Sequence, residues 1–372
     1  MKKNICALII ILTFGLLTGC SKELPTKVNP PDNTGTTQPK DTNTEPKDTT
    51  TKPIDPSSKD TTDLAKIGDY YPFEKNIKYM YKGDGNEYAT YSVFVDYLRG
   101  NRQQIRINNG GTETVQVLEN SDGELRRTYS KGENYYREDV TSKSNQKSDV
   151  LLKEPLTKGN SWTALDGSKR SITSIKVAIK TSLASYECIE VTTVRKESIN
   201  KEYYAADIGL VKTLFTSGGS EVSSILSKTD NNIPFIQTVK FYYPNGNDSM
   251  NYTIDREISF NTNDNTKKMF EDHFKEAPNK NTGKLISPNT TIKSLYLNND
   301  NMVYVDFSEE FTKEMNAGSG YESQILQCIT NTLGDYYMVK KVYITVEGKP
   351  YSSGHILMKK GEAFVVDHKN TK

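Results

Sequence analysis

Alternation of apolar and polar residues with a period of two runs through residues 66–229, and this pattern restricts the fold more than any other feature. The clearest runs are 88–98, 104–107, 113–118 and 172–179. Side chains two positions apart share one face of a strand, so each run predicts a strand with one buried and one wet face. Glycine- and asparagine-rich turns such as 108–111 and 121–123 separate the runs by a few residues. The segment therefore predicts an antiparallel meander of about eight to eleven strands.

A different pattern follows in residues 235–368, where strands are interleaved with two helices. We expect a helix capped by Asn263 or Asp264 that ends near Glu276, and a second that opens with a Ser319 and Glu322 capping box and ends at Gly334. Predicted strands lie at 238–244, 252–260, 292–297, 302–307 and 339–346. Two helices on one face of a mixed or antiparallel sheet make a two-layer α/β sandwich. The whole chain is thus predicted to be an α+β protein, with a β-rich meander domain followed by this sandwich.

The amino-terminal 19 residues have the features of a secretory signal. Lys2 and Lys3 precede an apolar run at 5–17, which is shorter than the about 20 residues needed to span a bilayer. The run ends in Leu17-Thr-Gly-Cys20, which resembles the bacterial lipobox. That resemblance implies cleavage between Gly19 and Cys20, and diacylglycerol on the Cys20 sulfur, with palmitate among its acyl chains. The alternative is an uncleaved signal anchor with an incidental cysteine.

Residues 20–63 differ in composition from everything that follows. From residue 21 to 63 there are 11 threonines, 7 of the 14 prolines and no aromatic residue. Such a segment cannot bury enough apolar surface to offset the entropy lost on ordering. We expect a disordered tether that starts at the lipidated cysteine, with a glycosylated or partner-binding stalk as the alternative.

Charge and motif content exclude several classes of function. The 48 lysines and arginines nearly balance 47 acidic residues, so the chain lacks the basic excess of a nucleic-acid-binding protein. The sequence contains no zinc-protease, redox, serine-hydrolase or phosphate-loop motif, and we expect no catalytic residue, no metal site and no cofactor. Of the cysteines in the mature chain, Cys188 and Cys328 are expected to be buried thiols, with a disulfide bridge or a nucleophile as the alternatives.

Other polar groups have ordinary explanations. His273 lies on the apolar face of a predicted helix. Asp306, Glu309 and Glu310 follow a strand, where solvated carboxylates are the default interpretation. The oxygen-rich run 261–266 lacks the glycine and glutamate of a calcium loop, and a helix cap explains it better.

A string of motifs in the last third of the chain resembles the GerMN domain of spore-germination proteins. The matching segments are 303–311, 318–319, Glu322, 329–333 and 342–349. The resemblance implies an extracytoplasmic, non-enzymatic domain, often on a lipoprotein of a Gram-positive bacterium, linked to sporulation, germination and assembly of envelope complexes. The segments 274–278 and 288–291 depart from the family pattern, which puts any partner contact of that loop in doubt.

These observations lead to one expected function and two alternatives. We expect a lipoprotein on the outer face of the cell membrane, anchored through Cys20, that binds envelope or sporulation proteins, or the cell wall, without catalysis. The first alternative is a receptor that holds a lipidic or small-molecule ligand in the tyrosine-rich meander. The second is a hydrolase of the cell wall.

Overall fold

The computed structural model describes residues 65–372. The predicted signal sequence at 1–19, and Cys20 with the whole tether at 20–63, lie outside the described residues. Their assignments stay predictions from sequence.

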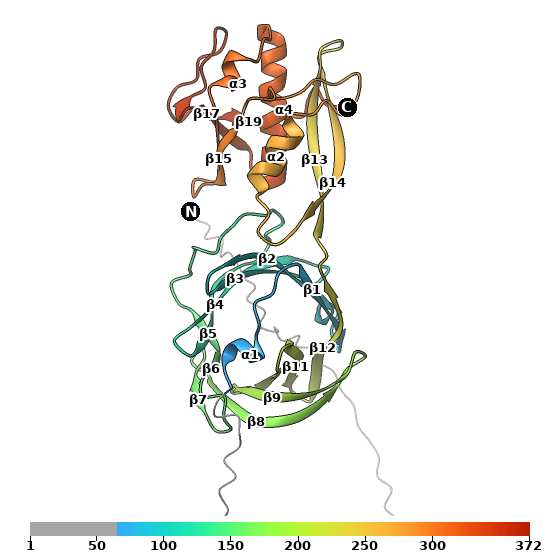
Figure 1. Cartoon of the computed structure of the whole chain (residues 1–372), viewed down its shortest axis with the longest axis vertical. Helices are drawn as coiled ribbons and strands as arrows, with labels where there is room; N and C mark the ends of the chain where they lie inside the picture. Colours follow the sequence, from blue (N-terminus) through green and yellow to red (C-terminus); the bar gives the residue numbers. More distant parts are fainter. Residues whose placement is uncertain (1–64) are drawn as a thin grey trace, which may run out of the picture. The chain divides into compact units, whose positions relative to one another are not determined.

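Residues 77–231 form one antiparallel sheet of twelve strands, β1–β12 (Figure 1). Apart from β6 and β7, successive strands pair along the chain, as the alternating pattern predicts, but there is one strand more than the upper expected number. The strands are β1 (Ile77–Asp84), β2 (Tyr91–Arg99), β3 (Arg102–Asn108), β4 (Glu113–Ser121), β5 (Glu124–Lys131), β6 (Asp149–Lys153), β7 (Ser161–Thr163), β8 (Lys169–Lys180), β9 (Ser185–Val194), β10 (Ser198–Ala205), β11 (Gly209–Ser217) and β12 (Ser220–Asn231).

The sheet curls round on itself (Figure 1), and its first and last strands, β1 and β12, pair in the middle of the strand order. Ile77 of β1 lies opposite Asn231 of β12. The two edge strands, β6 and β7, also approach each other, since the indole Nε1 of Trp162 donates to the carbonyl of Val150 at 2.9 Å. We refer to this part of the molecule as the curled sheet.

Apolar side chains from one face of the strands fill the inside of the curled sheet. They form a cluster that includes Leu118, Val191 and Leu226, and Ile67 of the short helix α1 (Ile67–Tyr70) packs into it. Trp162 is a buried member of this cluster. Between these side chains the curled sheet leaves a cavity of about 140 Å³.

The C-terminal region contains a hairpin, a mixed sheet and three helices. Strands β15 and β16 are antiparallel and β16 runs parallel to β17, so the sheet is mixed, with β18 and β19 both paired to β17. The hairpin of β13 and β14 forms a separate two-stranded sheet. The elements are β13 (Phe235–Asn245), β14 (Met250–Phe260), α2 (Thr266–Phe274), β15 (Ile292–Leu297), β16 (Val303–Phe307), α3 (Glu310–Lys313), α4 (Ser319–Tyr337), β17 (Lys341–Val346), β18 (Lys349–Pro350) and β19 (Phe364–Val365); a three-residue 3₁₀ turn, η2 (Glu87–Ala89), precedes β2 in the curled sheet.

Three details of the predicted helices are wrong. The cap of α2 is Asn265, whose side chain accepts from the Lys267 N–H, rather than Asn263 or Asp264. The capping box of α4 does not form, because Gly318 is the N-cap and the Glu322 carboxylate bonds to Tyr351 and His355 instead.

The second helix also continues through Gly334 to Tyr337. Gly334 is there for a packing reason, since a Cβ atom at this position would meet a methyl carbon of Val366 at 2.2 Å. The sequence does not distinguish a glycine that allows close packing of a neighbouring segment from a glycine that ends a helix.

Within residues 65–372, no helix combines the length and apolar character that crossing a membrane requires.

Candidate functional site

The loop 132–148, between β5 and β6, joins the curled sheet to the C-terminal core. Tyr136 from this loop belongs to the apolar cluster of the C-terminal region. Its ring lies 5.1 Å from the ring of Tyr337 in α4. The Tyr336 hydroxyl accepts from the backbone N–H of Arg137 at 3.0 Å, and Gln237 of β13 donates to the Tyr135 carbonyl at 2.7 Å. The loop is therefore part of the folded core.

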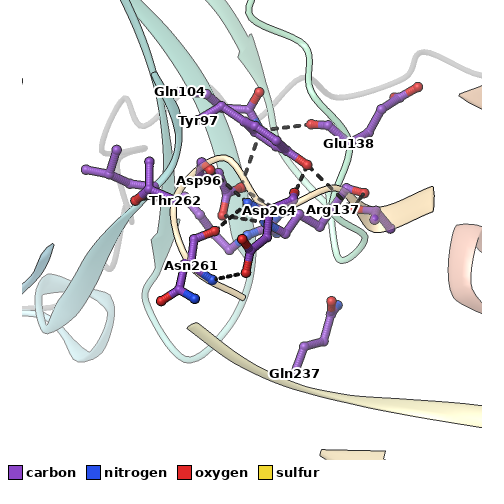
Figure 2. Close-up of polar contacts among 12 residues, drawn as sticks. Asp96, Tyr97, Gln104, Arg137, Glu138, Gln237, Asn261, Thr262 and Asp264 are labelled. Atoms are coloured by element: carbon purple, nitrogen blue, oxygen red, sulfur yellow. Dashed lines mark hydrogen bonds and ion pairs between the residues drawn. The ribbon is translucent and has the colours of Figure 1, made fainter. Parts of the chain in front are cut away.

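Arg137 is the centre of this junction and is fully buried (Figure 2). Its guanidinium donates to the carbonyl of Asn261 at 3.0 Å and to the carbonyl of Asp264. It also donates to the Tyr97 hydroxyl and the Asp96 carbonyl, both at 2.8 Å. One side chain thus bonds β2 of the curled sheet to the segment that leads into α2.

A second arginine, Arg106 of β3, shares the Asp96 carboxylate. Its guanidinium pairs with Asp96 at 3.0 Å and with Glu113 at 2.7 Å. It also donates to the carbonyls of Asn134 and Tyr136, which fixes the course of the loop. Burial alone would lower the pKa of Arg106, but Asp96 and Glu113 more than offset this and raise it, so the guanidinium stays charged.

The Asp96 carboxylate lies between both guanidinium groups. Gln104 donates to its Oδ2 at 3.3 Å, while Oδ1 is 3.8 Å from Arg137 Nε without a hydrogen bond. Two buried cations facing two carboxylates leave no net charge in the cluster. The arrangement suits a rigid connection between two apolar cores, because each buried charge needs its partners in place.

A ladder of three tyrosines lies on the face of the mixed sheet that points away from the core. Val303, Val305 and Phe307 of β16 point into the apolar core. Alternation therefore puts Tyr304 on the opposite face, directly across from Tyr296 of β15 and Tyr343 of β17. The ring centroids are 5.5 Å apart for Tyr296 and Tyr304 and 5.0 Å apart for Tyr304 and Tyr343. We call Tyr296, Tyr304 and Tyr343 the tyrosine ladder.

The ladder is open at one end. Tyr296 is 42% exposed, whereas Tyr343 is nearly buried and its hydroxyl accepts from the Gly361 N–H. Tyrosines give a large contact area for little loss of conformational entropy and are enriched in protein interfaces. The exposed end of the ladder is therefore our candidate interface.

Glu322 of α4 anchors the segment that follows β18. Its carboxylate accepts from the Tyr351 hydroxyl and contacts His355 Nδ1, both at 2.7 Å. Burial raises the pKa of Glu322, but hydrogen bonds from Ser353, His355 and Tyr351 outweigh it and hold the pKa below its usual range. Since Ser353 and His355 both point at the carboxylate, they are not arranged as a nucleophile and its base.

The other polar residues singled out in the sequence make contacts that stabilise the fold. His273 contacts Glu276 and packs its ring on Phe241, and His368 contacts Asp335. Asp306 accepts from Thr345 and from the Gly348 N–H, which fixes the turn after β17. Glu309 pairs with Lys313 in the exposed first turn of α3. In the part of the chain that the structure describes, no three histidine, cysteine, aspartate or glutamate side chains gather as a metal site would require.

Both predicted buried thiols are confirmed. Cys188 and Cys328 are free and fully buried, each in a different apolar cluster.

Comparison with protein families identifies the C-terminal region. Residues 240–352 match the Germane family, which is described as sporulation and spore germination. The match begins within β13 and covers the rest of the hairpin, the helices α2, α3 and α4, and the strands of the tyrosine ladder. It confirms the resemblance noted in the sequence. No curated protein matches the chain as a sequence.

Solved structures of low identity are similar to part of the chain. The tandem GerMN domains of the sporulation protein GerM from Bacillus subtilis are 15% identical, with 35% of this chain and 46% of that chain covered and a TM-score of 0.27. The first GerMN domain of the same protein is 18% identical, with 35% and 97% covered and a TM-score of 0.27. A protein from Parabacteroides distasonis, assigned as a lipoprotein, is 15% identical, with 43% and 98% covered and a TM-score of 0.28. The chain thus spans just under half of the tandem GerMN structure.

Proposed function

We propose that this protein is a lipid-anchored, extracytoplasmic binding module that helps to assemble envelope complexes during sporulation or germination, because residues 240–352 match the Germane family. The family match is the observation that carries the proposal. The lipobox-like Leu17-Thr-Gly-Cys20 supports the anchor, and the threonine- and proline-rich segment that follows supports a flexible spacer.

The proposed role is non-catalytic. The Germane family is not a known enzyme family, and the polar clusters at Asp96 and Glu322 are occupied by structural hydrogen bonds and ion pairs. We assign recognition of an envelope protein to the exposed end of the tyrosine ladder. Aromatic side chains of tyrosine can bury apolar area against a partner while their hydroxyls remain available for hydrogen bonds.

The anchor is tested by replacing one atom. In a Cys20→Ser variant the sulfur that would carry diacylglycerol is gone, so we expect labelled palmitate on the wild-type protein and none on the variant. A variant that still incorporates palmitate, or a wild-type protein that incorporates none, would contradict the lipid anchor, while leaving the Germane assignment untouched.

The interface is tested by photocrosslinking in living cells, in vegetative growth and in sporulation. A photoreactive amino acid replaces Tyr296, which is 42% exposed; the matched control replaces Tyr88, which is 52% exposed on the curled sheet. We expect crosslinks to envelope or sporulation proteins from position 296 and few from position 88. Equal crosslinking from both positions, or recovery of bulk surface proteins alone, would reject this interface.

A further inference from the structure

The cavity inside the curled sheet has an aromatic lining. Pro72 and strands from both halves of the sheet surround it, with a volume of about 140 Å³. Five of the lining residues are tyrosines, namely Tyr71, Tyr79, Tyr81, Tyr91 and Tyr204. The rings of Tyr81 and Tyr91 are stacked, with centroids 4.5 Å apart. A flat, apolar molecule would find ring faces in such a space.

One polar atom of the lining lacks a partner. Gln103 of β3 lines the cavity and is only 3% exposed, yet its Oε1 has no hydrogen-bond donor among residues 65–372. Ile105 and Ile107 follow at alternate positions and line the same cavity, so the strand presents this face inward. A buried acceptor left unpaired costs about 1–3 kcal/mol, and a donor from a ligand would recover that cost.

The charged groups of the lining already have partners in the protein. Arg127 donates to Asp149 at 3.2 Å, and Glu202 accepts from the Tyr204 hydroxyl at 3.3 Å. The Tyr81 hydroxyl donates to the Leu210 carbonyl. Burial raises the pKa of Tyr71 and of Tyr91, so these rings stay neutral. The lining therefore offers no unpaired charge to a ligand. Because burying an unpaired charge is costly, the ligand should be neutral.

Size limits the ligand further. Sites for drug-sized molecules measure about 300–1,000 Å³, whereas an apolar protein cavity of about 150 Å³ holds one benzene ring. The cavity of about 140 Å³ is too small to enclose a lipid and matches a single ring.

We propose that the curled sheet binds a small, neutral aromatic alcohol in this cavity, with its ring among the tyrosines and its hydroxyl donating to Oε1 of Gln103. The site is independent of the Germane domain and of the proposed interface. Binding here would give the protein a second, small-molecule function.

The test compares two probes of one shape, p-cresol and toluene, in calorimetric titrations of the full mature chain with Cys20→Ala. Toluene lacks only the hydroxyl. We expect p-cresol to bind about ten-fold more tightly, which corresponds to one net hydrogen bond. In Gln103→Leu the preference for p-cresol should disappear while toluene still binds. The matched control is Gln116→Leu, which alters another glutamine of the same lining and should keep the preference.

Several results would overturn the proposal. Absence of binding by both probes to the wild-type chain would mean that water alone occupies the cavity. Equal affinity for both probes, or a p-cresol preference that survives in Gln103→Leu, would show that Gln103 is not the polar anchor. If Gln103→Leu fails to fold, Gln103→Glu replaces it. That change introduces a carboxylate that needs its own donor, and it should alter p-cresol binding more than toluene binding.

Discussion

Arg137 donates a hydrogen bond of 3.0 Å to the carbonyl of Asn261, although 124 positions separate the two residues in the sequence. The bond connects a loop of the curled sheet to the segment that begins α2. Because Arg137 also bonds to Asp96 and Tyr97, the curled sheet and the region that matches the Germane family share one buried polar cluster. We expect the two to unfold together, which a single calorimetric transition would show.

Asp96 is the residue whose loss should weaken this cluster most. Asp96→Asn leaves Arg106 and Arg137 buried with only Glu113 as a counter-charge, so we expect the free energy of unfolding to fall by about 3 kcal/mol or more. Urea denaturation measures the loss. The control is Glu119→Gln, which breaks the less buried pair with Arg102 and should cost about 1 kcal/mol or less. Equal losses in the two variants would show that the cluster is not a special source of stability.

Gly334 should tolerate no side chain. In Gly334→Ala the new methyl group would collide with Val366 at 2.2 Å, and we expect a loss of about 1–3 kcal/mol on urea denaturation. Gly320→Ala is the matched control in the same helix, because a Cβ atom there meets nothing within 4 Å. That change should be neutral or should stabilise by up to about 1 kcal/mol. A neutral Gly334→Ala would mean that the segment at Val366 can move aside.

Acid should weaken the anchoring of the segment at Glu322. The pKa of Glu322 is lowered in the folded protein, so its contribution to stability is complete above the unfolded value of about 4.3 and is lost as the pH falls through the folded value. We expect the urea midpoint of the wild type to drop more steeply as the pH falls below about 5 than that of Glu322→Gln.

Tyr351→Phe provides an intermediate case. It removes one donor to the Glu322 carboxylate and should reduce the steepness only in part. If the urea midpoints of the wild type and of Glu322→Gln depend on pH in the same way, the ionised Glu322 does not stabilise this segment.

The two thiols should be unreactive in the folded chain. Burial, and then Glu187, raise the pKa of Cys188 to about 12, and burial raises that of Cys328. In the mature chain with Cys20→Ala, a thiol reagent at about pH 8 should label neither residue until urea unfolds the protein, and should then label both. Rapid labelling of one thiol in the native chain would identify a locally open segment.

Much of the fold could be predicted from the sequence because period-two alternation and short turns specify antiparallel neighbours. The alternation in 303–307 also predicts which residues form the candidate interface, because Tyr304 lies on the face of the strand opposite to Val303 and Val305. The pattern does not show which strands lie beside this one, and therefore the sequence alone does not predict the tyrosine ladder.

Long-range contacts set the limit of the sequence prediction. Arg137 and Tyr136 lie in a polar loop without periodicity, and nothing local shows that they pack into another core. Gln103 belongs to a regular strand, and only the structure shows that its oxygen lacks a donor. Long-range contacts also explain why the predicted capping box of α4 does not form. Tyr351 and His355, which lie outside the helix, bind the Glu322 carboxylate that the capping box would need.

The pairing of β1 with β12 has a consequence for how the chain acquires its structure. Ile77 cannot meet Asn231 until the whole intervening meander is available, whereas each hairpin between them can form from neighbours. Contacts between residues so far apart in the sequence form slowly, because loop entropy is lost before they form. During that interval β1 has an unpaired edge, so a partly folded chain would be most exposed to aggregation at this strand.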